Sequence, residues 1–458
     1  MPFALRETDQ RAFRRRLLLV SLLGLGLRAA FLLLEPPTGP VADERMWVVW
    51  GADVLPSPEV AFSPLAFRLI FHPPLYPYFI GVLSAFMGGL PAVKVAQVAV
   101  GALLAPVLGL LGRRLFGPAA GLLAALIAAG YPELVWFSVH FWVEGVFVVL
   151  LWGAFERLFA ADEEGSWRRA AVAGLLFGLS ILARETAFYF LPLAALWLGW
   201  RRPEGALRAA SFLLAAFAVV APWTLRNYVA YGAFVPVSTA GALNLWQGNT
   251  RLSRQEVYEQ YWAVHGRIEK YHFARQKGIE AIAQRQPFWL FEKLGSEMPT
   301  FWEADGQPLV HIRRGAYGEV RPLRALLASG VVLLPYLSVL ALFVLGLVLV
   351  PLTRGSGLLL AFLAYYNLLH VATHGYARYR LPALPVLFLL GAAGIVAWSR
   401  RPRPAVSRAW TAVAGAVALV LLLSLVPSLG LLVHRAWGQP DPGDRVTEEA
   451  DEPVRPWP

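Results

Sequence analysis

The stretch "RRRLLLVSLLGLGLRAAFLLLEPPTGPVADERMWVVW" (residues 14–50) decides the fold. A basic flank precedes an apolar run about as long as the ~20 residues that cross a bilayer. Because the run lacks a cleavage site of small residues, it predicts an uncleaved first helix with residues 1–16 as a cytoplasmic N-terminus. The carboxylates of Asp43 and Glu44 then fall in the first loop on the extracytoplasmic side.

The composition predicts an all-α polytopic membrane protein. Hydrophobic residues make up 57% of the 458 residues, charged residues 16%, and the mean hydropathy is +0.53, which is more apolar than a water-soluble core can bury. The net charge of +11 comes from arginine clusters beside apolar runs. Such clusters set topology or touch membrane lipids, so we expect no nucleic acid partner. The absence of cysteine excludes disulfides and thiolate chemistry.

Arginine clusters also predict which loops are cytoplasmic. They occur at 113–114, 168–169, 201–202 and 399–408. Counting helices forward from the N-terminus and backward from 399–408 gives results that differ by one helix between residues 75 and 200. One segment there must be re-entrant or wrongly bounded, and the predicted total is 11–13 transmembrane helices. The apolar segments are 17–35, 75–92, 95–112, 118–131, 137–153, 170–183, 186–200, 205–222, 328–350, 357–373, 381–398 and 410–433.

Two segments are too polar to lie in the membrane. The Pro-rich first outer loop, 36–74, contains a predicted short helix at 43–55, and the roughly hundred-residue insert 224–327 shows amphipathic patterning over 254–286. We expect the insert to be a helical extracytoplasmic cap rather than an independent enzyme. The predicted divisions are an N-terminal transmembrane catalytic module (17–223), the insert, C-terminal transmembrane helices (328–433) and an extracytoplasmic tail (434–458).

Asp43 and Glu44 are the first candidates for chemistry. In a helix over 43–55, Asp43, Trp47 and Trp50 share one face, while Glu44 points about 100° away. Asp43 would then present a carboxylate beside two indoles at the membrane interface. The structural alternative is that Asp43 only caps the helix N-terminus.

A second polar group lies in "NLLHVATHGYARYRLPALP" (367–385). Asn367, His370, His374 and Arg378 recur at spacings of three, four and four, which predicts one polar stripe along an apolar helix. Arg378 and Arg380 could clamp a phosphate group at the outer face. The alternative is that these are ordinary polar residues at the membrane interface, near the end of a transmembrane helix. A metal site at the two histidines is not favoured, because no neighbouring carboxylate completes it.

Isolated charges elsewhere repeat this pattern. Glu144, Arg184 and Arg226 all fall near the predicted outer boundary, and each alone is typical of an interfacial residue. Together with Asp43 and Arg378 they describe an outer rim with acidic groups and several arginines.

Five motifs occur in order along most of the chain: "ADERMWVVWGADVL" (42–55), "HPPLYPYFIG" (72–81), "LSILARETAFYFLP" (179–192), "PWTLRNYVAYGAFVPVSTAGALNLWQGN" (222–249) and "RYRLPALPVLFLLGAAGI" (378–395). With them the chain resembles GT-C glycosyltransferases, in the branch of lipid A aminoarabinose transferases and protein O-mannosyltransferases. The first motif departs from that branch by carrying Trp47 in place of tyrosine.

The resemblance implies transfer of a sugar from a polyprenyl-phosphate donor to a lipid, glycan or protein acceptor on the extracytoplasmic face. It aligns Asp43 with the family's catalytic acid and leaves Glu44 as the reserve base. A carboxylate can accept the proton of an acceptor hydroxyl, and arginines can stabilise the leaving phosphate. The expected residues are therefore Asp43 and Glu44 (catalytic), Arg378, Arg380, Arg184 and Arg226 (donor phosphate), and His72, Glu144, His374 and Asn244 (substrate).

No cofactor is expected, and a divalent metal is unsupported because the outer loops lack Asp-x-Asp. The expected location is the plasma (inner) membrane of the cell envelope, with the site on the periplasmic or extracytoplasmic side. Two other functions remain open: a flippase or transporter of lipid-linked sugars, and a membrane glycan ligase that uses a diphosphate lipid. The lack of an internal repeat weakens the transporter, and a purely structural subunit would not explain the ordered motifs.

Overall fold

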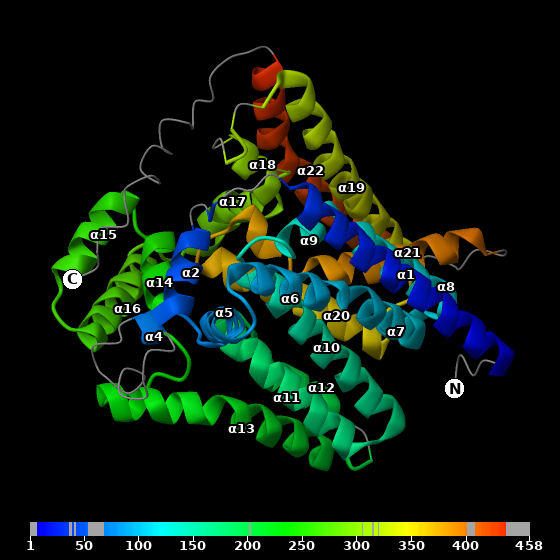
Figure 1. Ribbon diagram of the computed structural model, residues 1–458, viewed down its shortest axis with the longest axis horizontal. Helices are drawn as coiled ribbons and strands as arrows, with labels where there is room; N and C mark the ends of the chain where they lie inside the picture. The colour runs from blue at the N-terminus through cyan, green and yellow to red at the C-terminus, as the bar shows by residue number, and fades with distance from the viewer. Residues whose placement is uncertain are drawn as a thin grey trace.

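The computed structural model describes residues 7–35, 39–40, 43–53, 68–200, 203–304, 306–313, 316–318, 320–400 and 408–436. These residues form helices and connecting turns, without a strand (Figure 1). Five helices are long and apolar enough to cross a membrane, and four shorter ones are apolar as well. The predicted all-helical membrane class is therefore confirmed. The predicted tail, 434–458, lies almost wholly outside the described residues.

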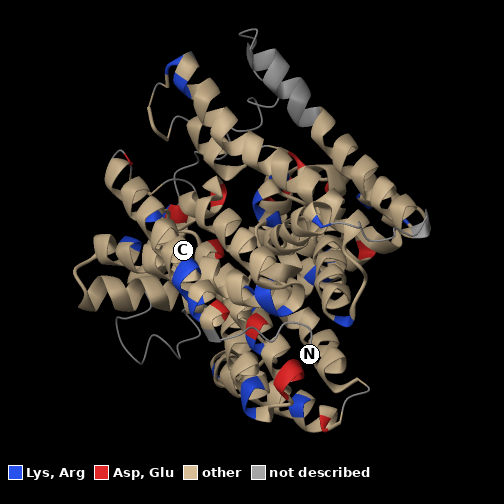
Figure 2. Ribbon diagram, turned by 90° about the vertical axis from the view of Figure 1, so that its right-hand side faces the viewer, with Lys and Arg blue, Asp and Glu red and all other residues tan. Residues whose placement is uncertain are grey.

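Every predicted apolar segment contains a helix. The helices that run along the bundle are α1 (Glu7–Leu34), α6 (Leu90–Ala102) continued by α7 (Leu104–Phe116), α8 (Pro118–Gly130), α10 (Val143–Glu164), α11 (Trp167–Ala183), η1 (Glu185–Phe190) continued by α12 (Leu191–Gly199), α13 (Gly205–Tyr231), α19 (Pro322–Leu349), α20 (Arg354–Ala372), α21 (Leu384–Ser399) and α22 (Arg408–Ala436). Figure 2, which views the molecule from the right-hand side of Figure 1, shows that charged residues are few among them.

Ion pairs define one end of the bundle, which we call the arginine face. Arg114 at the end of α7 pairs with glutamates at the end of α10, and Arg354 at the start of α20 pairs with Asp162 of α10. The guanidinium of Arg113 lies over the ring of Phe13 in α1. The ends of α1, α7, α10 and α20 therefore meet here, as the arginine clusters predicted.

The opposite end, which we call the Asp43 face, is also marked by ion pairs. Glu35, directly after α1, lies 2.7 Å from His140 and 3.7 Å from Lys94 of α6. Glu144 at the start of α10 pairs with Arg184 at the end of α11. The starts of α6 and α10 and the ends of α1 and α11 thus lie together, at the end where the sequence placed the outer loops.

The short helix α5 (Leu75–Phe86) accounts for the odd helix in the sequence-based topology. Tyr76 in its first turn donates a hydrogen bond to Gln97 of α6 (2.7 Å), and α6 itself begins on the Asp43 face. Because the chain both enters α5 and leaves it for α6 on this face, α5 does not cross. With α5 left out, the order of the remaining helices in the described residues fits eleven passes between the faces, the lower bound of the predicted range.

The insert is shorter than predicted, because α13 continues through Pro222 to Tyr231 and α19 begins at Pro322. Its helices are α14 (Ala240–Asn249), α15 (Arg254–Ala263), α16 (Arg267–Ala283), α17 (Trp289–Trp302) and α18 (Gln307–Arg313). α14, α15 and α16 share a small hydrophobic core around Trp246, Val257 and Tyr261. α17 instead packs against α20 and α22 of the bundle, so the insert is fastened to the membrane helices.

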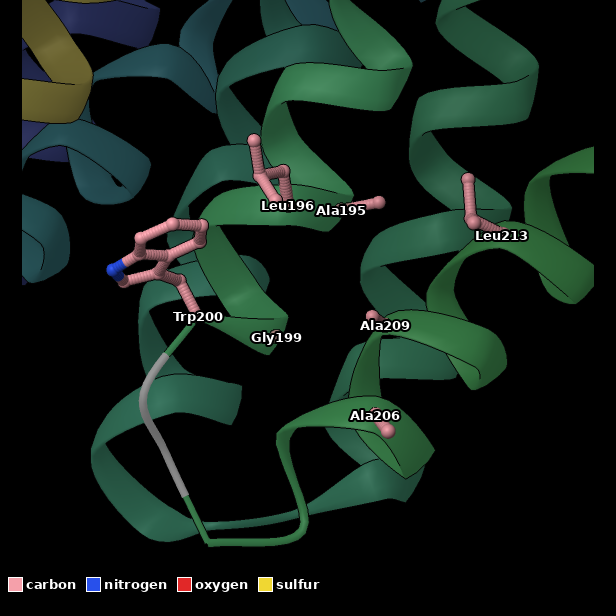
Figure 3. Close-up of a pocket in the computed structure, with 7 residues that line it drawn as sticks. All are labelled: Ala195, Leu196, Gly199, Trp200, Ala206, Ala209 and Leu213. Carbon is pink, nitrogen blue, oxygen red and sulfur yellow. The ribbon is translucent and has the colours of Figure 1, made fainter.

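Figure 3 shows an apolar groove of about 720 Å³ between the end of α12 and the start of α13. It lies at the arginine face, since Arg354 donates a hydrogen bond to the carbonyl of Trp200 there. Of the described residues that line it, none is titratable. The lining residues are Ala195, Leu196, Gly199, Trp200, Ala206, Ala209 and Leu213.

The path of α5 can be tested with single cysteines, because the chain has none of its own. We expect Met87→Cys, at an exposed position after α5, to react with a membrane-impermeant maleimide from the same side as Gln255→Cys in the insert. Arg168→Cys, in the exposed first turn of α11, should react only from the other side. Labelling of Met87→Cys from the side of Arg168→Cys would show that α5 crosses.

Candidate active site

The centre of the candidate site is an ion pair between Asp43 and Arg378. Asp43 is the first residue of α2 (Asp43–Asp53), and Arg378 lies in the short helix η2 (Ala377–Arg380). The Asp43 Oδ2 and the Arg378 Nη1 are 2.6 Å apart, although the two residues are separated by 335 positions in the sequence. The Asp43 side chain is 42% exposed and that of Arg378 21%, so a substrate can reach both groups.

The pair keeps Asp43 ionised. Burial alone would raise the pKa of Asp43, but the guanidinium of Arg378 outweighs it, and the pKa lies below its ordinary value. Arg254, the first residue of α15 in the insert, also lowers the pKa of this carboxyl. A carboxylate that is charged at neutral pH can accept a proton.

Aromatic packing positions α2. Trp47 and Trp50 are buried and meet edge-to-face at 5.7 Å, which confirms the predicted helix and its indole face. The His72 ring lies 5.2 Å from Trp47 and 4.8 Å from both Trp50 and Phe71. Burial lowers the pKa of His72 to about 3. His72 is therefore a neutral ring packed among Trp47, Trp50 and Phe71, not a cation.

Glu44 points away from Asp43, as the helical period predicted. It is 3% exposed, and its Oε1 accepts a hydrogen bond from the backbone N–H of Phe141 at 2.8 Å. Its Oε2 lies 3.9 Å from His311 of α18. Glu44 thus fastens α2 to the segment before α10, and its position does not support the reserve role as a base.

Two arginines of the site, Arg378 and Arg184, lie against the ring of Tyr379. The Arg378 guanidinium stacks on Trp142 and Tyr379, with 4.8 and 5.1 Å from its ζ carbon to the ring centroids. Arg184 lies 5.0 Å from the same Tyr379 ring and pairs with the buried Glu144 at 2.7 Å. Arg378 is thus paired with Asp43, and Arg184 with Glu144. Glu144 influences the site only indirectly, by holding Arg184.

His374 and Asn244 also come to this region. The His374 Nε2 is 3.4 Å from the Tyr379 hydroxyl oxygen. Burial lowers the pKa of His374 to about 4, although the backbone of Asn244 in α14 favours the protonated ring. A neutral imidazole beside Tyr379 can form hydrogen bonds with a substrate but adds no charge.

The predicted polar stripe along one helix is wrong, because α20 ends at Ala372 and the chain turns at Thr373. Asn367 accepts a hydrogen bond from Trp302 at 2.7 Å, and His370 is buried with its ring stacked on Tyr379 at 4.9 Å. His374 and Arg378 lie beyond the helix. Nevertheless, His370, His374 and Arg378 all contact Tyr379.

Arg380 and Arg226 are not part of this centre. Arg380 is fully buried, 3.4 Å from Glu133, and donates to the backbone carbonyl of Glu303. Arg226 is buried in α13 with its guanidinium over the ring of Tyr231. Their positions indicate structural roles and give no support to phosphate binding.

Sequence reasoning missed three contributors: Trp142, Tyr379 and Arg254. Tyr379 stands between two singled-out arginines, which could have drawn attention to it, but nothing in the sequence connects Trp142 or Arg254 to Asp43. Among the residues that the structure describes, no three or more His, Asp or Glu side chains are grouped to hold a metal ion.

Residues 71–225 match the family model described as dolichyl-phosphate-mannose-protein mannosyltransferase. The match includes Glu144 and Arg184 but not Asp43 or Arg378. It supports membership of the GT-C superfamily of membrane glycosyltransferases, to which the sequence motifs pointed. No curated protein sequence matches the chain.

Solved structures of an archaeal oligosaccharyltransferase, AglB from Archaeoglobus fulgidus, are similar over most of this chain. The complex with an inhibitory peptide and a dolichol-phosphate is 14% identical, with a TM-score of 0.49, and the match covers 92% of this chain and 55% of the other. The apo form is 13% identical, with a TM-score of 0.47, covering 97% and 58%. This chain thus spans little more than half the length of that protein.

The two ion pairs should differ in their effect on stability. Glu144→Gln leaves the guanidinium of Arg184 with a neutral partner inside the protein, which should cost about 1–3 kcal/mol. Asp43→Asn, at a half-exposed position, should cost less than about 1 kcal/mol. Thermal unfolding in detergent, followed by tryptophan fluorescence, should show a clearly lower Tm only for Glu144→Gln. Equal losses would mean that the Asp43 pair is mainly structural.

Proposed function

We propose that the protein transfers a sugar from a polyprenyl-monophosphate donor to a lipid, glycan or protein acceptor at the Asp43 face. The observation that carries this proposal is the half-exposed Asp43–Arg378 ion pair at 2.6 Å. It holds a carboxylate and a guanidinium side by side at the Asp43 face, which supports roles as base and as anion-binding group.

In the proposed reaction, Asp43 is the general base. An acceptor hydroxyl loses its proton to the carboxylate as its oxygen bonds to the anomeric carbon of the sugar. The bond between that carbon and the phosphate oxygen breaks, and its electron pair leaves with the polyprenyl phosphate. The proton then passes to solvent or to the released phosphate.

Arg378 is the proposed ligand of the leaving phosphate. A guanidinium carries five N–H donors, and Arg378 uses one for Asp43 and directs another toward Tyr379 at 3.5 Å. Further donors can therefore meet the growing negative charge of the phosphate, an interaction that is strong where both groups are charged. Arg184 also lies against the Tyr379 ring, but its charge is balanced by Glu144.

The name of the matched family supports the class of donor, because dolichyl-phosphate-mannose is a polyprenyl-monophosphate sugar. Membrane helices suit such a donor, since its prenyl chain can remain in the lipid while its phosphate reaches the Asp43 face. We place the protein in the plasma (inner) membrane with this face outside the cytoplasm, because Arg113, Arg114 and Arg169 lie at the other end. The insert is the proposed surface for the acceptor.

Asp43→Asn should lower transfer at least about 100-fold, since it removes the base and keeps the shape of the side chain. The assay uses purified protein in lipid nanodiscs with labelled polyprenyl-monophosphate sugars and crude envelope acceptors, and measures released polyprenyl phosphate. Glu163→Gln, an exposed carboxylate of α10 at the arginine face, is the control and should retain activity. Equal activity of Asp43→Asn and wild type would overturn the role of Asp43, and movement of label across the bilayer without transfer would favour a transporter.

Arg378→Ala should weaken binding of polyprenyl phosphate about 10- to 100-fold, the loss expected for a charged hydrogen bond. The Kd can be measured by quenching of tryptophan fluorescence in nanodiscs. Arg251→Ala, which removes an exposed arginine of the insert, serves as the control and should bind normally. An unchanged Kd for Arg378→Ala would remove Arg378 from the phosphate site.

A further inference from the structure

A buried lysine in the insert holds the turn that leads to Arg378. Lys293 of α17 is 1% exposed, and its ammonium donates to the carbonyls of Gly248 (2.5 Å) and Thr373 (2.8 Å) and to the Glu297 Oε1 (2.7 Å). These three bonds use all the N–H donors of the ammonium. Lys293 therefore joins α14, α17 and the turn after α20.

Glu297 completes this connection. Its Oε2 accepts a hydrogen bond from the backbone N–H of Gly375 at 2.7 Å. A β-carbon at Gly375 would lie 2.4 Å from the backbone oxygen of Glu297, and one at Gly248 would lie 1.8 Å from the carbonyl oxygen of Thr373. Only glycine allows the three segments to approach so closely.

The contacts also satisfy the end of α20. The last carbonyls of a helix lack partners within the helix and carry a partial negative charge. Lys293 binds the carbonyl of Thr373, and Asn249 of α14 donates to that of Ala372 at 2.8 Å. The direction in which the chain leaves α20 is thus set by side chains of the insert.

We propose that Lys293 is a positioning residue for the donor-phosphate site, acting through the turn 373–375 on Arg378. Only two residues separate Gly375 from Arg378. At no more than ~3.6 Å per residue, the backbone of Arg378 must stay close to the turn, so a displacement of the turn also displaces Arg378. The insert, which is the proposed acceptor surface, then also determines the geometry of the donor site. This inference rests on the proposed function.

The test compares Lys293→Met with Trp302→Phe in nanodiscs. The control removes the 2.7 Å hydrogen bond between Trp302 and Asn367, which joins the same helices, α17 and α20, away from the turn. We expect Lys293→Met to raise both the KM for the donor and the Kd for polyprenyl phosphate at least 10-fold, with kcat changed less than 3-fold. Trp302→Phe should lower the Tm but leave KM and Kd within 2-fold of wild type.

Glu297→Gln provides a second variant if Lys293→Met does not fold. It retains an acceptor for Lys293 but can lose the bond to Gly375, so KM and Kd should rise 3- to 10-fold. Unchanged KM and Kd in these variants, or an equal rise in Trp302→Phe, would overturn the positioning role while leaving the transferase intact. If wild type binds polyprenyl phosphate without transferring sugar, a weaker Kd in Lys293→Met still supports positioning, and only the proposed reaction fails.

Discussion

The ion pair between Asp43 and Arg378 depends on nearly every other part of the structure. Asp43 is the first residue of α2, which buries its own Trp47 and Trp50. Arg378 follows the turn after α20. Because the two residues are 335 positions apart in the sequence, their contact requires the first outer loop, the insert and the C-terminal helices to be in place together. Separate regions of the chain thus contribute the proposed base and the proposed phosphate ligand.

Charge balance then distinguishes the roles of the neighbouring groups. Glu144 neutralises Arg184 inside the protein, whereas Asp43 neutralises Arg378 at a position that solvent reaches. In the proposed reaction the donor phosphate shares the donors of Arg378 with Asp43, so the same guanidinium lies near both the base and the leaving group. The buried pair holds Arg184 beside Tyr379, whereas the exposed pair is the one proposed to take part in the chemistry.

The local features of the sequence were sufficient to predict helices, because bilayer-length apolar runs and a 3.6-residue period depend on neighbouring residues. They located α2, its indole face and the different directions of Asp43 and Glu44. They did not show that α5 stays on one side, because a short apolar helix resembles a span. Arg378 and Arg380 illustrate the limit: two residues apart in the sequence, one pairs with Asp43 and the other with Glu133, and only long-range packing decides this.

The most direct measurement is a structure in lipid nanodiscs with a phosphonate analogue of the polyprenyl-phosphate sugar, which cannot release its sugar. The account predicts the phosphonate within hydrogen-bond distance of the Arg378 guanidinium and the sugar over the Asp43 face, with the prenyl chain in the lipid. A phosphonate held at the arginine face, or at the Asp43 face without contact to Arg378, would contradict it.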